Sequence, residues 1–180
     1  MKKYGNHFTL SSICFALLAS LTSITVNAAP VGVITTHGKE TLKIKKCRTS
    51  GYYNFSSYVF TLNDDKSWDF YDSESDVYAS GFGRYSGSLK SRKFSLASSP
   101  AVTQLMKATL EANAAQLCGV GGHLTGYSPF IYKVKLNKNR TSASIALKSK
   151  LKGISDYGQR TSGTYTVSGK GSYSIPSISK

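Results

Sequence analysis

The stretch FIYKVKLNKNRTSASIALKSK, residues 130–150, decides the fold that we expect for this chain. Apolar and polar residues alternate on both sides of a central segment rich in Asn and Lys. This pattern is typical of two half-buried antiparallel strands joined by a turn. We expect the turn at Asn137–Arg140 and three cross-strand pairs: Leu136 with Thr141, Val134 with Ala143, and Tyr132 with Ile145. A slip by one residue would turn the apolar side chains of one strand outward.

The same register predicts a row of cations on the outer face of this hairpin. The candidates for anion binding are Lys133, Lys135, Lys148, Lys150, Lys152 and Arg140. Like charges at neighbouring positions of a sheet repel one another, so an anionic partner would relieve the repulsion. Outside the cytoplasm such a partner is lipopolysaccharide, an acidic glycan, an anionic lipid headgroup or nucleic acid. A solvated face that uses lysine to discourage edge-to-edge aggregation is the alternative interpretation.

Alternation continues through most of the remaining chain. It predicts strands over 40–46, 83–88 and 93–96, a hairpin over 57–71, and a last hairpin in which 165–167 and 173–175 flank a turn at Ser168–Gly171. Leu62-Asn63 followed by Lys66-Ser67 also resembles Leu136-Asn137 followed by Arg140-Thr141. This similarity indicates either an internal repeat or the shared chemistry of hairpin turns.

One helix interrupts the strands, at about residues 100–118. Ser99 can cap it, Pro100 fits the first helical position, and Gly119 can end it. Its apolar stripe consists of Val102, Leu105, Met106, Leu110, Ala114 and Leu117. The glycine-rich segment 119–126 follows the helix instead of preceding it, so it predicts a flexible connection and not a phosphate cradle.

These elements predict a mainly β (α+β) fold in a single domain. We expect an antiparallel meander, closed as a small barrel or left as a strongly curved sheet, with the amphipathic helix packed on it.

The first 28 residues have the pattern of a signal peptide. Lys2 and Lys3 precede an apolar stretch, and Val26-Asn27-Ala28 supplies small residues for cleavage. The apolar stretch is too short for a membrane span. We therefore expect one β-rich domain over 29–180, exported to the bacterial periplasm or the exterior, and not an integral membrane protein. Cys47 and Cys118 then remain in an oxidising compartment, where two cysteines can form one intramolecular disulfide.

The chain of 180 residues has a formal net charge of +14, yet residues 64–76 hold six acidic residues and one basic residue. Asp72, Glu74 and Asp76 alternate like the start of a calcium loop. Val77 and Gly83 stand where such a loop needs glycine and glutamate. Calcium binding here is therefore a weak candidate, and a solvated or lysine-paired loop is the alternative. We expect no other metal and no cofactor.

No motif for catalysis is present: the sequence lacks HExxH, paired CxxC and Gly-x-Ser-x-Gly. We expect a non-enzymatic binding protein with no catalytic residues. Three alternatives stay open. They are a barrel that carries a small apolar ligand, a hydrolase in which His123 or His37 meets Asp72, Asp76 or Asp156, and a subunit that self-assembles by its acidic segment meeting its basic face. Tyr52, Tyr53, Tyr71 and Tyr78 also fall outside the inward alternation and could stack on a ligand.

Overall fold

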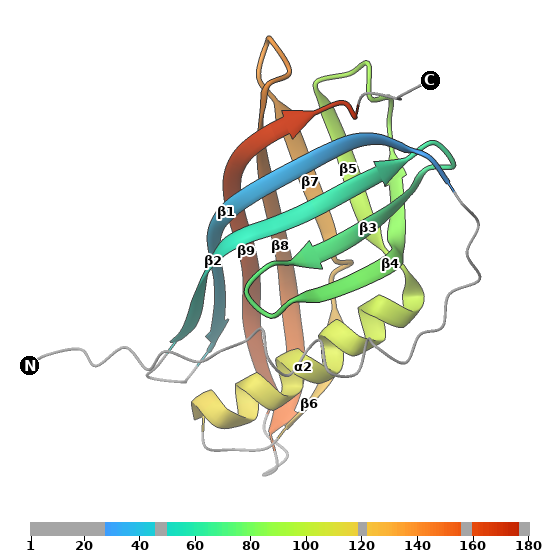
Figure 1. Ribbon diagram of the computed structural model, residues 1–180. Helices are drawn as coiled ribbons and strands as arrows, with labels where there is room; N and C mark the ends of the chain where they lie inside the picture. Colours follow the sequence, from blue (N-terminus) through green and yellow to red (C-terminus); the bar gives the residue numbers. More distant parts are fainter. Residues whose placement is uncertain (1–27, 46–49, 119–121, 156–159, 177–180) are drawn as a thin grey trace, which may run out of the picture.

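A computed structural model describes residues 28–45, 50–118, 122–155 and 160–176 of the chain. These residues form a closed antiparallel barrel with one helix lying across an end of it (Figure 1). The mainly β architecture predicted from the sequence is therefore confirmed, and of the two predicted forms the structure adopts the closed barrel.

The strands are β1 (Pro30–Ile44), β2 (Ser50–Asn63), β3 (Ser67–Asp72), β4 (Val77–Ser86), β5 (Lys93–Ser98), β6 (Gly122–Tyr127), β7 (Ile131–Leu136), β8 (Ser142–Ser155) and β9 (Arg160–Ser174). Around the barrel they follow the order β8-β7-β5-β4-β3-β2-β1-β9, and β9 pairs again with β8 to close the ring. Every neighbouring pair in this ring is antiparallel.

The long strand β8 has two partners, one after the other, on the edge away from β9. β7 pairs with the segment Ala143–Ala146, and β6 pairs with Leu151–Ser155. Between them Ser128 N donates to the carbonyl of Lys150 at 2.9 Å. The segment after the helix is thus a paired strand, and the prediction of a flexible connection over 119–126 is wrong for residues 122–126. The pairing with β8 was not visible in the local sequence because it joins residues far apart in the chain.

The inward side chains of the strands fill the barrel with aromatic and aliphatic groups. Trp68, Phe60, Phe130, Ile34, Leu42, Leu62, Leu96, Leu136, Leu151 and Val167 are almost completely buried. Trp68 packs against Phe82 with ring centroids 4.7 Å apart, and its indole Nε1 donates to the carbonyl of Ala97 at 3.1 Å. A buried indole N–H needs such a partner. The predicted hairpin over 57–71 is confirmed, with Phe60 opposite Phe70 in the β2–β3 pair.

The helix α2 (Pro100–Cys118) has the predicted bounds. The hydroxyl of Ser99 accepts a hydrogen bond from Val102 N at 3.3 Å, as an N-cap residue does. The buried face contains Val102, Met106 and Leu110, as predicted, and also the polar residues Thr109 and Asn113. α2 packs against β1, β2 and β6. In the described part of the chain no helix combines the length and the apolar character that crossing a membrane requires.

The C-terminal strand departs from the prediction. Residues 160–174 form the single strand β9, so the predicted turn at Ser168–Gly171 is wrong, and Ile175 is exposed. Its glycines serve close packing instead of a turn. Gly169 pairs with Gly38 of β1, and a Cβ atom on Gly38 would lie 2.6 Å from the Cα atom of Gly169 and 2.8 Å from Cζ of Phe55. Glycine inside a strand often marks such a close approach.

The two turns that look alike in sequence also look alike in structure. Asn63 Nδ2 donates to the Ser67 hydroxyl at 3.0 Å, and Asn137 Nδ2 donates to the Thr141 hydroxyl at 3.0 Å. The fourth residue of each turn has a positive φ, 72° at Lys66 and 54° at Arg140. The resemblance therefore includes a shared turn chemistry.

Candidate functional site

The strands β7 and β8 place their lysines outward, as predicted. Along β7 the exposed Lys133 and Lys135 alternate with buried Tyr132, Val134 and Leu136. Along β8 the exposed lysines are Lys148, Lys150 and Lys152. Between them Ser149 and Leu151 are buried. The apolar alternation fixes these directions because the inward residues belong to the core.

The predicted register of this hairpin is wrong by two residues. Leu136 pairs with Ala143 and Val134 with Ile145, whereas the expected partners were Thr141 and Ala143. Asn137 N donates to the carbonyl of Ser142, and this bond closes a longer turn than the sequence indicated. A shift of two residues keeps every side chain on its face. It also brings Lys133 opposite Ala146, so that Lys148 is its diagonal neighbour.

Two further lysines on the neighbouring strands belong to the same outer surface. Lys93 of β5 pairs directly with Lys135 of β7, and Lys170 of β9 pairs with Ser144 of β8. Sequence reasoning missed both because their position depends on which strands lie beside β7 and β8. We define the lysine face as the following exposed residues: Lys93, Lys133, Lys135, Lys148, Lys150, Lys152 and Lys170.

The lysine face contains no carboxylate to balance these charges. β5, β7, β8 and β9 contain no Asp or Glu, and small residues such as Ser144, Ala146 and Thr166 stand between the lysines. The ion pair between described residues, Lys107 with Glu111 at 3.9 Å, lies on α2. Lysine side chains two residues apart on one strand lie about 7 Å apart. The surface therefore presents amines at a regular spacing.

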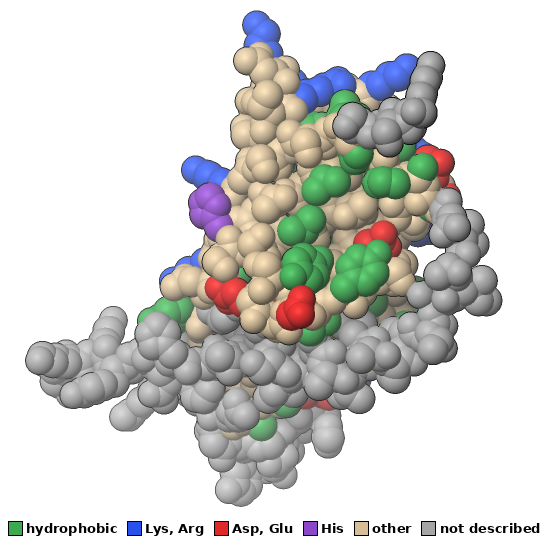
Figure 2. Space-filling view, viewed as in Figure 1, with side chains coloured by type: hydrophobic (Ala, Val, Ile, Leu, Met, Phe, Trp, Pro, Cys, Tyr) green, Lys and Arg blue, Asp and Glu red, His purple; other side chains and the backbone are tan. Residues whose placement is uncertain are grey.

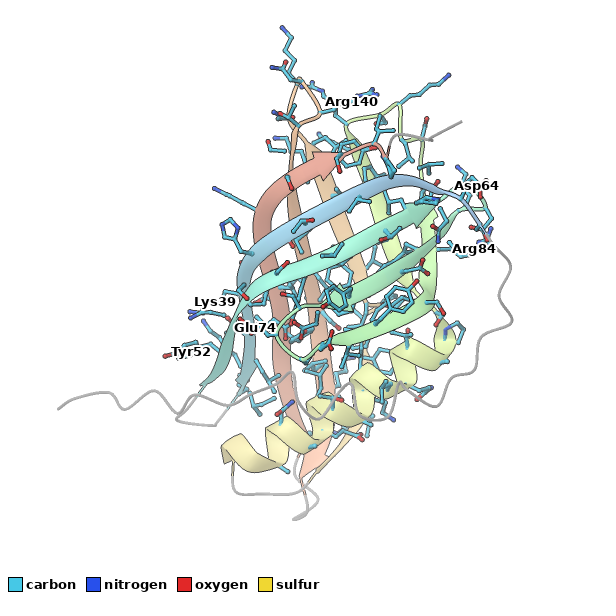
Figure 3. The ribbon with its side chains drawn as sticks, in the orientation of Figure 1. Lys39, Tyr52, Asp64, Glu74, Arg84 and Arg140 are labelled. Atoms are coloured by element: carbon cyan, nitrogen blue, oxygen red, sulfur yellow. The ribbon has the colours of Figure 1, made fainter. Side chains whose placement is uncertain are left out.

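Arg140 lies apart from this surface. It occupies the β7–β8 turn, at the end of the barrel remote from α2 (Figure 3). Its Nη2 donates to the carbonyl of Lys90. Among the predicted anion-binding residues, Arg140 is thus at a barrel end, and the five lysines share the outer surface.

The acidic segment lies on the other side of the barrel. β1 to β4 form the front in Figure 1, and β5, β7 and β8 lie behind them. Figure 2, in the same orientation, shows acidic and apolar side chains on this front, with Lys and Arg at its margins. Asp64 and Asp65 are in the β2–β3 turn, and Glu74 and Asp76 are in the β3–β4 turn.

The three carboxylates of the calcium candidate point to different surroundings. Asp72 is completely buried and accepts hydrogen bonds from Glu74 N at 3.0 Å and from the Ser75 hydroxyl at 2.8 Å. Glu74 accepts from Ser56 N, and Asp76 accepts from the Tyr71 hydroxyl. Among the described residues no group of three or more His, Cys, Asp or Glu is placed to hold a metal ion. The alternate spacing of Asp72, Glu74 and Asp76 suggested a shared site, but Asp72 points to the inside of the barrel as part of β3.

A buried polar group inside the barrel was not predicted. Glu40 of β1 is 7% exposed and accepts a hydrogen bond of 3.0 Å from the Tyr58 hydroxyl. Burial raises the pKa of Glu40 to about 7, hydrogen bonds from Tyr165 and Tyr58 oppose this rise, and the Asp72 charge adds to it. Burial and the nearby Glu40 likewise raise the pKa of Tyr58. In the sequence, Glu40 falls at the same alternation as the inward residues Thr36 and Leu42. This spacing could have predicted that the Glu40 side chain is buried.

The described residues do not bring a histidine and a carboxylate of the hydrolase alternative together. His37 is exposed on β1, whereas Asp72 is buried inside the barrel, so these two do not meet. The backbone of His123 lies in β6, paired with Ile154, but its side chain and Asp156 lie outside what the structure describes.

The predicted aromatic candidates separate into different places. Tyr52 has the Lys39 ammonium 4.6 Å from its ring centroid, and Figure 3 shows both near the lower end of β1 and β2. The side chain of Tyr53 is outside the described set. Tyr71 and Tyr78 are neighbours on the outer side of β3 and β4.

Two predictions fall outside the described residues. Residues 1–27 hold most of the predicted signal peptide, and Cys47 lies within 46–49, so neither the signal peptide nor the disulfide to Cys118 is placed. Both stay sequence predictions.

Comparison with known proteins adds no relative: no protein-family model and no curated protein matches this chain.

Proposed function

We propose that this protein is an exported, non-enzymatic binding protein whose lysine face contacts an anionic component of the cell envelope or its surroundings. The observation that carries the proposal is the composition of four neighbouring strands. β5, β7, β8 and β9 contribute seven exposed lysines and no carboxylate to one continuous outer surface.

The pair of Lys93 and Lys135 supports an anionic ligand most directly. Their residues are directly opposite in an antiparallel pair, where like charges are unfavourable. An exposed surface that needed only solubility would alternate the two signs of charge. A polyanion that bridges these amines removes the repulsion and releases its own counterions.

The chemistry favours a ligand with repeated negative charges over a single small anion. The exposed amines are spread over four neighbouring strands, so a single small anion can contact only a few of them. An extended phosphate- or carboxylate-bearing glycan or lipid surface can contact several of them at once. Each contact adds to the salt dependence of binding.

The test is retention on immobilised lipopolysaccharide and on heparin over a range of salt concentrations. The wild type should bind at low salt and elute steeply as salt rises. A triple variant Lys133→Gln, Lys135→Gln, Lys148→Gln should elute much earlier. The matched control Lys66→Gln, Lys90→Gln, Lys107→Gln removes the same charge from other surfaces and should elute near the wild type.

Equal loss of retention in both triple variants would assign binding to net charge alone and reject the lysine face as a site. Retention that does not respond to salt would reject the anionic ligand altogether. Stronger retention on lipopolysaccharide than on heparin at matched salt would identify the lipid-linked glycan as the better ligand of the two.

A further inference from the structure

The outer side of β2, β3 and β4 carries a row of apolar and aromatic side chains. Val59 pairs with Tyr71, and Tyr71 pairs with Tyr78, so the three residues stand side by side across three strands. Tyr78 is 60% exposed, which is unusual for a large ring on an otherwise polar sheet surface. We name Val59, Tyr71 and Tyr78 the tyrosine row.

Carboxylates flank the tyrosine row on both sides. The Tyr71 hydroxyl donates to Asp76 Oδ1 at 3.0 Å. Partial burial and the charge of the nearby Asp69 raise the pKa of Tyr78. Asp69 Oδ1 also accepts from Gly81 N at 2.7 Å, which holds this carboxylate in place. Residues 67–83 contain no Lys or Arg. The row thus combines the exposed ring of Tyr78 with fixed carboxylates beside it. Figure 2 shows apolar and acidic side chains gathered on this front side of the barrel.

This surface and the lysine face lie on opposite sides of the barrel. In the closed ring β3 is four strands away from β8 in either direction. The lysine face contains apolar atoms as well, because Ile131 is 37% exposed on β7 next to Lys133. Both surfaces therefore combine apolar groups with charge, and their charges have opposite signs.

From this complementarity we propose that the tyrosine row is a docking surface for the lysine face of a second copy of the chain. Ammonium groups from one copy meet the exposed ring of Tyr78 and the carboxylates Asp69 and Asp76 of the next. A cation over an aromatic ring and a nearby carboxylate are both favourable to lysine. The proposal does not depend on polyanion binding, although the two partners would compete for the lysine face.

The placement of the two surfaces also determines the shape of the assembly. The contact joins the tyrosine row of one copy to the lysine face of the other, so the pair keeps one free surface of each kind. Because these surfaces are on opposite sides of the barrel, repetition of the contact produces an open linear chain of barrels. Each copy has a net positive charge, so copies repel one another at low salt. Near 0.15 M salt the Debye length is about 8 Å, and this screening weakens the repulsion.

The experiment is sedimentation velocity of the full mature chain over a wide range of concentration at about 0.15 M and about 1 M salt. We expect the mean mass of the wild type to rise with concentration at the lower salt and to fall back at the higher salt. The variant Tyr78→Ser, Asp69→Asn, Asp76→Asn should stay monomeric. The control Asp64→Asn, Asp65→Asn neutralises the same number of charges in the β2–β3 turn and should associate like the wild type.

A mixing experiment separates this contact from general stickiness. The lysine variant Lys133→Gln, Lys135→Gln, Lys148→Gln should also be monomeric by itself. Mixed with the tyrosine-row variant, it should form a dimer that does not grow, because the pair has one intact surface of each kind. A monomeric wild type at all concentrations, or a mixture that stays monomeric, overturns the proposal.

The outcome is distinguishable from the test of polyanion binding. The tyrosine-row variant keeps its lysine face, so it should still be retained on heparin as strongly as the wild type. Loss of self-association with unchanged retention supports the docking surface. Unchanged self-association in that variant rejects it, whatever the result of the retention experiment.

Discussion

The hydroxyl of Tyr58 donates a hydrogen bond of 3.0 Å to Oε1 of Glu40 inside a barrel whose lining is otherwise mainly apolar. Tyr165 of β9 bonds the same carboxyl group, and the buried Asp72 of β3 acts on it through its charge. Three strands besides β1 thus determine how Glu40 ionises.

The contribution of Glu40 to the free energy of unfolding should fall as the pH rises from about 4.5 to above 7. Its pKa is raised from 4.5 to about 7 in the fold, so the folded state holds this proton where the unfolded chain has lost it. The contribution is present below the lower value and is lost as the pH passes the higher one. Glu40→Gln, which keeps an oxygen for Tyr58, should gain stability relative to wild type by up to about 3 kcal/mol at high pH. Urea unfolding of both proteins at pH 5 and pH 8 measures this difference, and parallel pH curves would contradict it.

Replacing Asn113 by leucine should stabilise the protein. Asn113 is 3% exposed on the buried face of α2, and its Nδ2 has no hydrogen-bond partner among the residues that the structure describes. An unpaired buried donor costs about 1 to 3 kcal/mol, and leucine of similar size removes that cost. Thermal unfolding should give a higher Tm for Asn113→Leu than for Asn113→Ala, which leaves a cavity. A lower Tm for the leucine variant than for wild type would indicate that the amide bonds a buried water.

Alanine at Gly38 should destabilise the barrel strongly. The new Cβ would lie 2.6 Å from the Cα atom of Gly169, and backbone there cannot move without disturbing the β1–β9 pairing. We expect a loss of about 3 kcal/mol or more in the free energy of unfolding. The matched control is Gly126→Ala, where the nearest atom would be 3.9 Å away. Similar denaturation midpoints for the two variants would refute the close approach of β1 and β9.

Changing Lys93 to serine should raise the Tm at low ionic strength. Lys93 stands directly opposite Lys135, and removal of one charge ends their repulsion. The difference from wild type should shrink as salt is added, because both side chains are exposed and salt screens them. Lys66→Ser is a control at an exposed lysine outside the lysine face. An effect that is independent of salt would point to a packing role for Lys93.

The cysteines give a prediction that comes from the sequence alone. After oxidation, the chain from residue 29 should be lighter than its reduced form by two hydrogen atoms, and Cys47→Ser should abolish the difference. Intact-mass measurement without reductant checks this. Two alkylatable thiols in the chain from residue 29, purified without reductant, would show that the bridge does not form.

Much of the fold could be predicted because the burial of the strand residues and the start of the helix depend on local sequence patterns. The alternation in 130–136 and 143–147 fixed which side chains are buried, and the cap at Ser99 with Pro100 fixed the start of the helix. The errors had long-range causes. The segment 122–127 forms β6 because it pairs with β8, which lies far along the sequence. Gly169 continues β9 instead of making a turn, and it lies close to β1 and Phe55.

By itself the sequence determined that the described part of the chain is β-rich with a helix at 100–118, and that the lysines of β7 and β8 point away from the core. Each of these follows from the period of the apolar residues, which is a local property of the chain. Only the tertiary structure decided that Lys93 and Lys170 join those lysines, that Glu40 meets Tyr58 and Tyr165, and that the tyrosine row lies opposite the lysine face. The physical reason is barrel closure. It selects which distant strands become neighbours, and that choice depends on the packing of the whole interior at once.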